Sequence, residues 1–571
     1  MELSENKVIS EAVEETASET VNTEKNNKFS SWWKKLSRGI KVTIISVALL
    51  VLAAIIVLIV LLATGKLGKN PSAIDPIDDN YRTFYQIFVG SFSDSDGDTI
   101  GDLRGIINRI DYLNDGDINN GNDLGVQGIW LSPIFESPSY HKYDAEDYYK
   151  IDEEFGTEED LKELIELCHE RNVKVILDLV INHSSIQNEW FLEFKKARQT
   201  GNTSSKYYDF YSCATADERE GGRTYQKIVG IDCYYECNFS GDMPELNFDN
   251  PVVKEEMLKL AKYYLDLGVD GFRFDAIKYI YFGDTKRSAE FWDWYMGELT
   301  AYKQDIYCVG ECWSAESEIL EYYDALNCFN FAMSGPESTA AAAAKGNNLG
   351  RFLNYIEQYQ DRIQGANPNG MPIQFLSNHD MDRIAGAFIY PEQMKMAANL
   401  YLLTPGSHFI YYGEEIGIRG SRGGANTDAN RRLAMLWGDK DQIGNPIGTT
   451  YSDNKQIQSN VKLQLKDESS MLNHYTKLIS VRNRYPAIAR GDYNAVTCSN
   501  KNFGGFYVEY NGEVLGIFHN NSISPVSIDL SECSGIDGHV FTQLCDYVGV
   551  GSASLEGNIL TIDGQTSVIL K

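Results

Sequence analysis

Four acidic side chains stand where short apolar runs of the chain end. They are Asp178, Asp275, Glu311 and Asp380. Carboxyl groups held close together can divide the work of catalysis, because one can act ionised as a nucleophile while another acts protonated as a general acid. A single carboxylate at a strand end is more often a cap or an ion-pair partner. The prediction of a reactive site therefore rests on the set.

The runs that carry these carboxylates predict buried parallel strands, because stretches with helical spacing separate them. Strands are expected at Gln127 to Leu131, Val173 to Leu179, Gly271 to Phe274, Ile306 to Val309 and Ile373 to Leu376. Helices are expected at Glu158 to Arg171 and, after Asn250 as N-cap, at Pro251 to Leu267. The alternation predicts an α/β fold with a (β/α)8 TIM barrel, in which the C-terminal ends of all strands lie on one face.

The intervals between the carboxylates fit such a barrel. Glu311 follows Asp275 by 36 residues, which is one βα unit, and precedes Asp380 by 69, which is about two. The longer gap from Asp178 to Asp275 predicts an inserted lobe at about 184–248, so the barrel with its lobe is expected to span 81–485. Short alternating strands with an Asn-Gly turn at 511–512 then predict a C-terminal all-β sandwich domain at 486–571.

A long apolar segment precedes the barrel. Of the 22 residues from Val42 to Ala63 only Thr43 and Ser46 are not apolar, which predicts a single transmembrane anchor at 40–63. Six Lys or Arg residues lie between 25 and 41 against three between 64 and 82. This bias predicts that the tail at 1–39 is cytoplasmic and that the folded part is extracellular, at the cell membrane. The Glu-rich start of the tail, which has almost no large apolar side chains, predicts that it is disordered, and the Gly and Pro residues at 64–80 predict a linker.

Composition excludes several classes of protein. The 571 residues are 43% apolar and 12% aromatic, which excludes a disordered chain. The formal charge of −30 disfavours nucleic acid as a partner and favours a neutral one. Ten Cys are too few for a disulfide scaffold; Cys533 could bridge to Cys545, and the other spacings decide nothing.

Four segments carry the carboxylates and define a resemblance. They are Asp178-Leu-Val-Ile-Asn182-His183, Gly271-Phe-Arg273-Phe-Asp275-Ala276-Ile-Lys278, Val309-Gly-Glu311-Cys-Trp313 and Phe375-Leu-Ser-Asn378-His379-Asp380. In order and spacing the segments resemble the α-amylase family of glycoside hydrolases, family 13, in the branch between α-amylases and oligo-1,6-glucosidases. Recognisable matches run from about residue 81 to residue 492.

The resemblance implies a retaining glycoside hydrolase that cleaves α-1,4-glucans such as starch and maltodextrins. Asp275 would be the nucleophile, Glu311 the acid/base, and Asp380 the group that fixes the distorted sugar by its hydroxyls. Arg273 lies on the same strand face as Asp275 and is expected to hold it ionised. The substrate contacts that the resemblance implies are Tyr143 as a stacking platform, Asp144, His183, Arg273, Lys278 and His379.

An acidic loop offers oxygens to a hard cation. Asp94, Asp96, Asp98 and Asp102 alternate with small or polar residues, but Thr99 and Gly105 stand where an EF-hand needs Gly and Glu. The resemblance implies one Ca²⁺ ion bound by these four side chains and the carbonyl of Ile100. Many α-amylases hold a second Ca²⁺ beside the Asn of the first segment with the help of a His carbonyl; Tyr279 takes that place here and argues against a second site at Asn182.

Departures from the family pattern bear on specificity. Met243-Pro-Glu245-Leu-Asn247 resembles the MPDLN signature of the intermediate branch with Glu for Asp, and Ala276 replaces the Val of α-1,6 specialists. Both favour α-1,4 bonds. The segment 432–437 only partly matches the RTPMQW segment of exo-acting relatives, so an α-glucosidase, a cyclomaltodextrinase and a transglycosylase stay open.

A different class of protein also fits the architecture. The heavy chains of amino-acid transporters are single-pass proteins with an amylase-like outer domain that lacks activity. The complete carboxylate set favours the enzyme, because a scaffold that does not catalyse has no need of it. We expect a monomer whose partners are an α-glucan substrate and, through the one anchor helix, the membrane.

Overall fold

The computed structural model describes residues 32–41, 79–118, 120–423 and 427–571, and the chain divides into two compact units, Met1–Ala73 and Ile74–Lys571. In the first unit residues 32–35 and 38–41 are helical. Within the described ranges, no helix combines the length and the apolar character that crossing a bilayer requires. The apolar core of the predicted anchor, 42–63, lies outside these ranges, as do most of the predicted tail and linker, so all three stay predictions.

Eight parallel strands form the barrel. In spatial order they are β11 (Asn327–Cys328), β10 (Tyr307–Gly310), β9 (Gly271–Phe274), β5 (Lys174–Leu179), β2 (Gly128–Leu131), β1 (Thr83–Ile87), β13 (Ser407–Tyr411) and β12 (Ile373–Phe375). Every neighbouring pair is parallel, and a parallel bridge between Phe329 and Ile373 joins the two ends of the sheet. The predicted (β/α)8 barrel is confirmed.

Large side chains fill the inside of the barrel. Phe84, Trp130, Tyr307, Phe329 and Phe409 belong to one buried cluster there, and the alternate residues of the strands pack outward against the helices. Because both faces of each strand are buried, the strands read in the sequence as nearly continuous apolar runs rather than as alternating ones.

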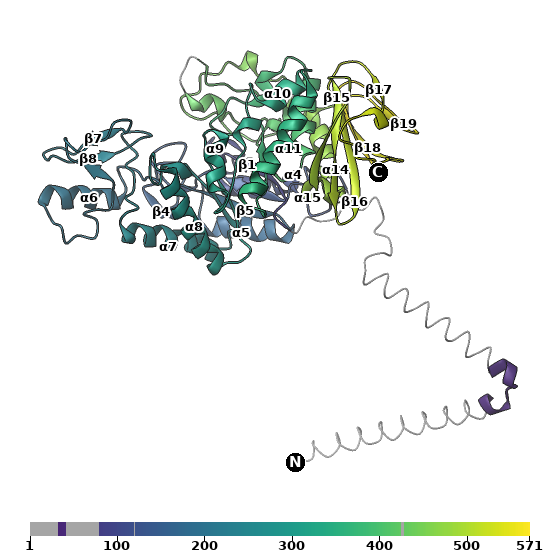
Figure 1. Cartoon of the computed structure of the whole chain (residues 1–571). Helices are drawn as coiled ribbons and strands as arrows, with labels where there is room; N and C mark the ends of the chain where they lie inside the picture. Colours follow the sequence, from purple (N-terminus) through teal and green to yellow (C-terminus); the bar gives the residue numbers. More distant parts are fainter. Residues whose placement is uncertain (1–31, 42–78, 119, 424–426) are drawn as a thin grey trace. The chain divides into compact units, whose positions relative to one another are not determined.

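Helices cover the outside of the barrel (Figure 1). They are α3 (Leu103–Asn108), α4 (Ile110–Leu113), α5 (Glu158–Glu170), α7 (Pro251–Asp266), α8 (Thr285–Tyr302), α9 (Glu316–Ile319), α10 (Thr339–Ala344), α11 (Leu349–Ala366), α12 (Pro391–Leu402), α13 (Val461–Gln464), α14 (Met471–Arg484) and α15 (Pro486–Arg490). The sequence places the two predicted helices to within one residue. In α7 the Asn250 side chain accepts a hydrogen bond from the Val252 N–H and Pro251 takes the first turn, as an N-cap followed by Pro should.

A small lobe interrupts the barrel between β5 and α7. It contains α6 (Glu189–Thr200) and a three-stranded sheet of β6 (Cys213–Ala214), β8 (Tyr234–Glu236) and β7 (Tyr225–Lys227). An isolated bridge between His183 and Glu245 ties its returning segment to the loop after β5. Within residues 79–571, β7, β8 and α6 lie at the end opposite to the strands β15 to β19 (Figure 1).

The C-terminal part is all-β, as predicted. A five-stranded sheet has the order β14 (Asp492–Thr497), β15 (Phe503–Tyr510), β16 (Glu513–Asn520), β21 (Thr566–Leu570) and β18 (Leu544–Gly549), and a three-stranded sheet has the order β17 (Val526–Asp529), β20 (Ile559–Ile562) and β19 (Ala553–Glu556). Asn511 and Gly512 both have positive φ and form the tight turn between β15 and β16.

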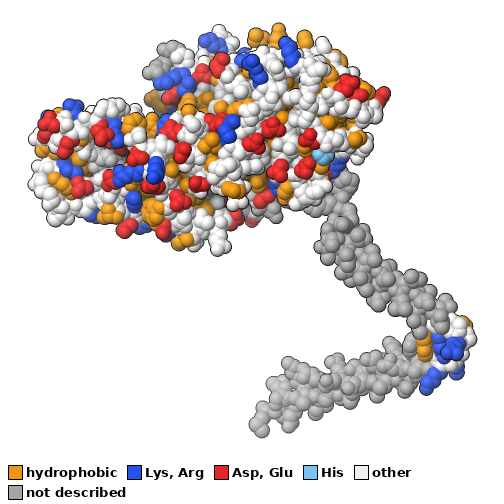
Figure 2. Space-filling model, in the orientation of Figure 1, with side chains coloured by type: hydrophobic (Ala, Val, Ile, Leu, Met, Phe, Trp, Pro, Cys, Tyr) orange, Lys and Arg blue, Asp and Glu red, His pale blue; other side chains and the backbone are white. Residues whose placement is uncertain are grey.

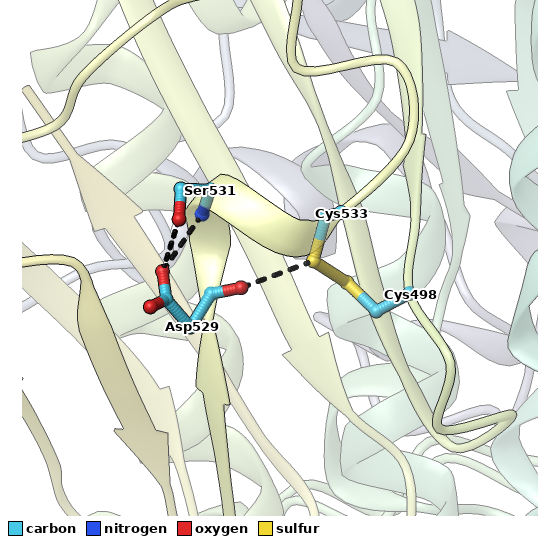
Figure 3. The surroundings of a disulfide bond; sticks show 4 residues. All are labelled: Cys498, Asp529, Ser531 and Cys533. Atoms are coloured by element: carbon cyan, nitrogen blue, oxygen red, sulfur yellow. Dashed lines mark hydrogen bonds between the residues drawn. A yellow bond between two sulfur atoms is a disulfide. The ribbon is translucent and has the colours of Figure 1, made fainter.

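The disulfide differs from the pairing that the sequence suggested. Cys533 is bonded to Cys498, not to Cys545 (Figure 3). Thr497 and Ser534 exchange both backbone hydrogen bonds in an antiparallel bridge, so Cys498 and Cys533 face each other as the next pair, where α-carbons come closest. Their Cα atoms lie 4.6 Å apart. Cys533 is thus bonded to a cysteine 35 residues away in the chain, Cys498, rather than to Cys545, which is 12 residues away.

The surface carries both signs of charge. Figure 2 shows carboxylates interspersed with Lys and Arg side chains over the drawn face. With 81 acidic and 51 basic residues in the chain, this distribution agrees with a neutral rather than an anionic partner.

Candidate active site

One arginine joins three of the four carboxylates at the C-terminal ends of the strands. Arg273 lies in β9, and its Nη1 is 2.7 Å from Oδ1 of Asp275 and 2.8 Å from Oδ1 of Asp178. Its Nη2 is 2.9 Å from Oε1 of Glu311, which follows β10. Arg273 has no exposed surface. Barrel closure therefore places residues from three separate strands around one buried guanidinium.

Asp380, in the loop after β12, has its own positive partner. Its Oδ1 is 2.7 Å from Nη2 of Arg432, and its Oδ2 is 2.9 Å from Nε2 of His379. Burial alone would raise the pKa of Asp380, but the hydrogen bond from His379 and the charges of Arg432 and Arg273 outweigh burial. The pKa is lowered, and Asp380 is ionised at neutral pH.

Asp275 and Glu311 share a different environment. Burial is the main cause that raises the pKa of both carboxyl groups; Arg273 opposes it and Asp380 adds to it. Arg273 donates a hydrogen bond to Asp275, which favours the ionised form, whereas its contact with Glu311 is an ion pair without hydrogen-bond geometry. A proton that binds to the pair is therefore better placed on Glu311.

A hydrogen-bonded chain fixes the ring of His379. The amide Nε2 of Gln86 lies 2.7 Å from Nδ1, so Nδ1 accepts and the ring proton resides on Nε2. Nε2 faces Asp380 and, at 2.6 Å, the hydroxyl of Tyr143. The Tyr143 hydroxyl in turn donates to Asp178 at 2.8 Å. Burial lowers the pKa of His379, which keeps the ring neutral.

A cavity of about 750 Å³ opens above these groups. Asp275, Glu311 and Asp380 all line it, and Tyr143, His183 and Lys278 do so as well. The remaining predicted contacts do not line the cavity. Arg273 and His379 lie beneath its floor without exposed surface, and Asp144 is buried in the loop after β2, where it accepts a hydrogen bond from Ser137 at 2.9 Å.

Two of the lining residues have polar atoms that suit a hydroxylated ligand. The Nε2 atom of His183 is buried and has no hydrogen-bond partner among the described residues. Burial lowers the pKa of His183 to about 4, so the ring is neutral. Lys278 donates from Nζ to the carbonyl of Trp313 at 2.8 Å, and the Trp313 ring stacks on Phe331 with a centroid distance of 5.2 Å.

Several residues of the site were not predicted. Arg432, from the segment after β13, contacts Asp380, the carbonyl of His379 and the Tyr140 hydroxyl. Trp130 donates from its indole nitrogen to Asp178 at 3.2 Å. For Arg432 the sequence offered only the partial match to RTPMQW, which bears on substrate specificity and does not indicate that the residue lies beside Asp380. For Trp130, in the middle of a buried strand, no sequence signal separates a site role from packing.

The acidic loop brings together three of the four side chains that were predicted to bind a cation. Carboxylate oxygens of Asp94, Asp96 and Asp102 lie within 4.8 Å of one another. The Asp98 carboxylate is not in this group, and its Oδ1 accepts a hydrogen bond from the Ile100 N–H at 2.7 Å. Burial raises the pKa of Asp102, and a bound cation would favour its ionised form. The three gathered carboxylates fit a hard cation such as Ca²⁺.

The fold and the site together define a class of protein. A closed (β/α)8 barrel that gathers carboxylates suited to act as nucleophile and as acid at one rim, where they line a cavity of this size, has the arrangement of a barrel glycosidase. The α-amylase catalytic domain model matches residues 86–491. The chain belongs to the α-amylase family of glycoside hydrolases.

Individual relatives agree with this assignment. Alpha-amylase 3 of Dictyoglomus thermophilum is 37% identical over 444 residues, which cover 76% of this chain and 84% of that protein. An oligo-1,6-glucosidase of Bacillus cereus is 29% identical over 530 residues, covering 78% and 91%. Among solved structures, Amy13B of Eubacterium rectale is 33% identical with a TM-score of 0.79, covering 87% of this chain and 97% of that one. The chain is therefore a glycosidase.

Proposed function

We propose that this glycosidase is an α-amylase that cleaves internal α-1,4 bonds of starch and maltodextrins with retention of configuration. The observation that carries the proposal is that Asp275, Glu311 and Asp380 line a single cavity. Asp275 and Glu311 also contact the same guanidinium, that of Arg273. Two carboxyl groups that contact one guanidinium can both reach one anomeric centre, which supports the retaining mechanism that the family resemblance implies.

The roles of the three carboxyl groups follow from their surroundings. Glu311, whose pKa burial raises, gives its proton to the glycosidic oxygen as the bond to C1 breaks, and Asp275 bonds to C1 and forms a glycosyl ester. Glu311 then takes a proton from water, whose oxygen bonds to C1 and displaces Asp275. Asp380, ionised beside Arg432, accepts hydrogen bonds from the hydroxyls of the distorted sugar.

The residue after the nucleophile supports the α-1,4 preference. Ala276 lines the cavity next to Asp275 and adopts a left-handed backbone conformation with φ of 49°. A β-branched side chain is disfavoured at such a φ and would project into the space beside the scissile bond. The small side chain leaves that space open.

Calcium binding is proposed for the acidic loop. Asp94, Asp96 and Asp102 would hold the ion. Asp98, whose carboxylate accepts from the Ile100 N–H, would contribute less. When bound, Ca²⁺ supplies a positive charge that relieves repulsion among the carboxylates. The side chain of Asp102 caps α3 by accepting from the Gly105 N–H at 2.6 Å, so the loop and that helix are fixed together.

Attachment to the cell surface is proposed from the sequence alone. The apolar run of 22 residues and the excess of Lys and Arg before it support an anchor with a cytoplasmic N-terminus and a catalytic domain outside. Anchoring would keep short products near the cell. The enzyme is proposed to act as a monomer on α-glucan chains.

Product analysis with matched variants tests the proposal. Purified full-length enzyme should release a range of maltooligosaccharides from amylose, cut oligosaccharides with blocked ends, and first yield α-anomers in proton NMR. Asp275→Asn and Glu311→Gln should each lower kcat by a factor on the order of 10³ or more. Asp147→Asn, an exposed carboxylate outside the cavity, should change nothing. Normal starch hydrolysis by Asp275→Asn would overturn the assignment.

A further inference from the structure

Two free cysteines lie side by side in the small lobe. In its sheet, Cys213 of β6 stands opposite Tyr235 of β8, and Cys233 precedes Tyr235 by two residues. Because side chains alternate along a strand, Cys213 and Cys233 lie on the same face of the sheet, as diagonal neighbours. Their thiols are hydrogen-bonded to each other, and neither sulfur takes part in a disulfide in this structure. The lobe therefore holds two thiols in contact.

The surroundings of this thiol pair favour a reactive sulfur at Cys233. The hydrogen bond from the Cys213 thiol lowers the pKa of Cys233 and raises the pKa of Cys213. The charge of Arg198 in α6 lowers the pKa of Cys233 as well, and Nε of Arg198 is buried without a hydrogen-bond partner among the described residues. Burial opposes these effects, but the pKa of Cys233 is lowered overall. A thiolate next to a cation is the form of cysteine that takes part in thiol–disulfide exchange.

A third cysteine of the lobe is less suited to such a reaction. Cys237 lies on the same face of the sheet as the pair, on the other side of Tyr235, but burial raises its pKa to about 11, so it stays protonated. Cys213 is partly exposed, which gives an oxidant access to the pair, whereas Cys237 is buried. The surroundings thus favour Cys213 and Cys233 as partners.

We propose that Cys213 and Cys233 form a redox-active pair, which a small organic disulfide oxidises to a second disulfide bond of the enzyme. The Cys233 thiolate attacks one sulfur of the oxidant, whose S–S bond breaks and releases one thiolate that takes up a proton. Cys213 then gives up its proton, and its sulfur bonds to Cys233 and displaces the second half of the oxidant as a thiol. Two thiols of the protein are oxidised, and one disulfide is reduced to two thiols.

The bond would fix the part of the lobe that forms a wall of the catalytic cavity. The segment after β8 carries Phe239 and Met243, which line that cavity, and the centroid of the Phe239 ring lies 5.0 Å from that of His183. Cys213 and Cys233 enclose a loop that is exposed at 216–222. Because a cross-link lowers the entropy of the unfolded loop, the oxidised enzyme should keep this wall in place at a higher temperature than the reduced one.

Peptide mapping of the full-length enzyme tests the pairing. The enzyme is incubated with glutathione disulfide or with glutathione, denatured in the presence of an alkylating agent, and digested without a reductant. Mass spectrometry should detect a peptide pair that joins Cys213 to Cys233 after glutathione disulfide, and both cysteines alkylated after glutathione. Cys545→Ser, which removes a partly exposed free cysteine outside the lobe, should leave this result unchanged. Cys213→Ser and Cys233→Ser should each abolish the linked peptides.

Inactivation by heat measures the consequence of the bond. The half-life of glycosidase activity at elevated temperature should be at least about threefold longer for the oxidised than for the reduced wild type. Cys213→Ala should show no such difference. This variant still contains the Cys498–Cys533 bond, so a redox effect that came from that bond would persist in it. Cys545→Ser should behave as the wild type does.

Three results of the mapping would overturn the inference: free thiols at both positions after glutathione disulfide, a bond from Cys213 to Cys237, or a glutathione adduct that persists on one cysteine without the internal bond. An equal gain in half-life in the wild type and in Cys213→Ala would overturn the proposed effect on the cavity wall. Circular dichroism verifies that each variant is folded. None of these outcomes depends on which glucosidic bond the enzyme cuts, so the proposed function stands or falls separately.

Discussion

Replacing Arg273 by Lys should move the acid side of the pH–activity profile upward. Arg273 contacts Asp178, Asp275 and Glu311 at 2.7 to 2.9 Å and has no exposed surface. Lys keeps the charge but is a single point donor, so it cannot reach all three carboxylates as the planar guanidinium does. A residue without charge would leave buried carboxylates unpaired at a cost of about 3–5 kcal/mol, which endangers folding.

The size of the effect follows from Coulomb's law. Two unit charges about 4 Å apart at an effective dielectric constant near 20 interact by roughly 4 kcal/mol. If Lys retains about half of the attraction felt by Asp275, the loss is roughly 2 kcal/mol, or somewhat more than one pH unit. Arg273 lowers the pKa of Asp275, so its replacement raises that pKa. Asp275 must be ionised to attack, hence activity is lost at a higher pH than in the wild type.

The assay is kcat/KM on a soluble maltooligosaccharide from about pH 4 to pH 9. The matched control is Arg104→Lys, because Arg104 also joins two carboxylates, Asp160 and Glu163, but does so at the surface with 40% exposure. The control should leave the profile unchanged. An Arg273→Lys enzyme whose acid limb coincides with that of the wild type would refute the electrostatic reasoning, whatever its absolute rate.

Three further predictions concern stability. Ca²⁺ at a concentration one hundred times its Kd should stabilise the fold by about 2.7 kcal/mol, measured as an increase in Tm. Asp96→Asn should reduce this increase more than Asp98→Asn does, because the Asp98 carboxylate lies outside the cluster of oxygens, and equal effects of the two variants would contradict the proposed site. Cys498→Ser should cost about 3–4 kcal/mol in urea unfolding and Cys545→Ser almost nothing, and the reverse order would exclude the observed pairing. Burial raises the pKa of Glu414 from 4.5 to about 8, so between these pH values the native state holds a proton that the unfolded chain has lost, and the free energy of unfolding should fall as pH rises. The Glu414→Gln variant should show a smaller decline, and the surface variant Glu392→Gln should show the same decline as the wild type. An unchanged slope in Glu414→Gln would contradict a buried neutral carboxyl group.

The parts of the fold with long, regular patterns could be predicted. The observed bounds of β2, β5, β9, β10 and β12 lie within one residue of the predicted runs. These strands could be predicted because a short apolar stretch between two amphipathic helices is typical of a buried parallel strand. β11 escaped prediction because it is only two residues long. β1 (TFYQI) and β13 (SHFIY) each contain two polar residues, so neither stands out in the sequence as a continuous apolar run.

The site also contains residues that could be predicted from the sequence and residues that could not. The gathering of Asp275, Glu311 and Asp380 in one cavity could be predicted because each stands at or shortly after the end of a recognisable strand, and barrel closure brings such ends together. Arg432 lies in an irregular segment, and its approach to Asp380 depends on how that segment folds back over the barrel. The disulfide shows the same limit: the bridge between Thr497 and Ser534 aligns the two cysteines, and spacing along the chain does not reveal that bridge.

Trapping the covalent intermediate tests the central claim most directly. A 5-fluoro-α-glucosyl or maltosyl fluoride reacts with a retaining enzyme and leaves the sugar on the nucleophile, because the electron-poor ring slows the second step. Peptide mass spectrometry of the labelled full-length enzyme should place the added sugar on Asp275, and none should appear on the Asp275→Asn variant. A label on any other carboxylate, or steady turnover without a label, would contradict the account.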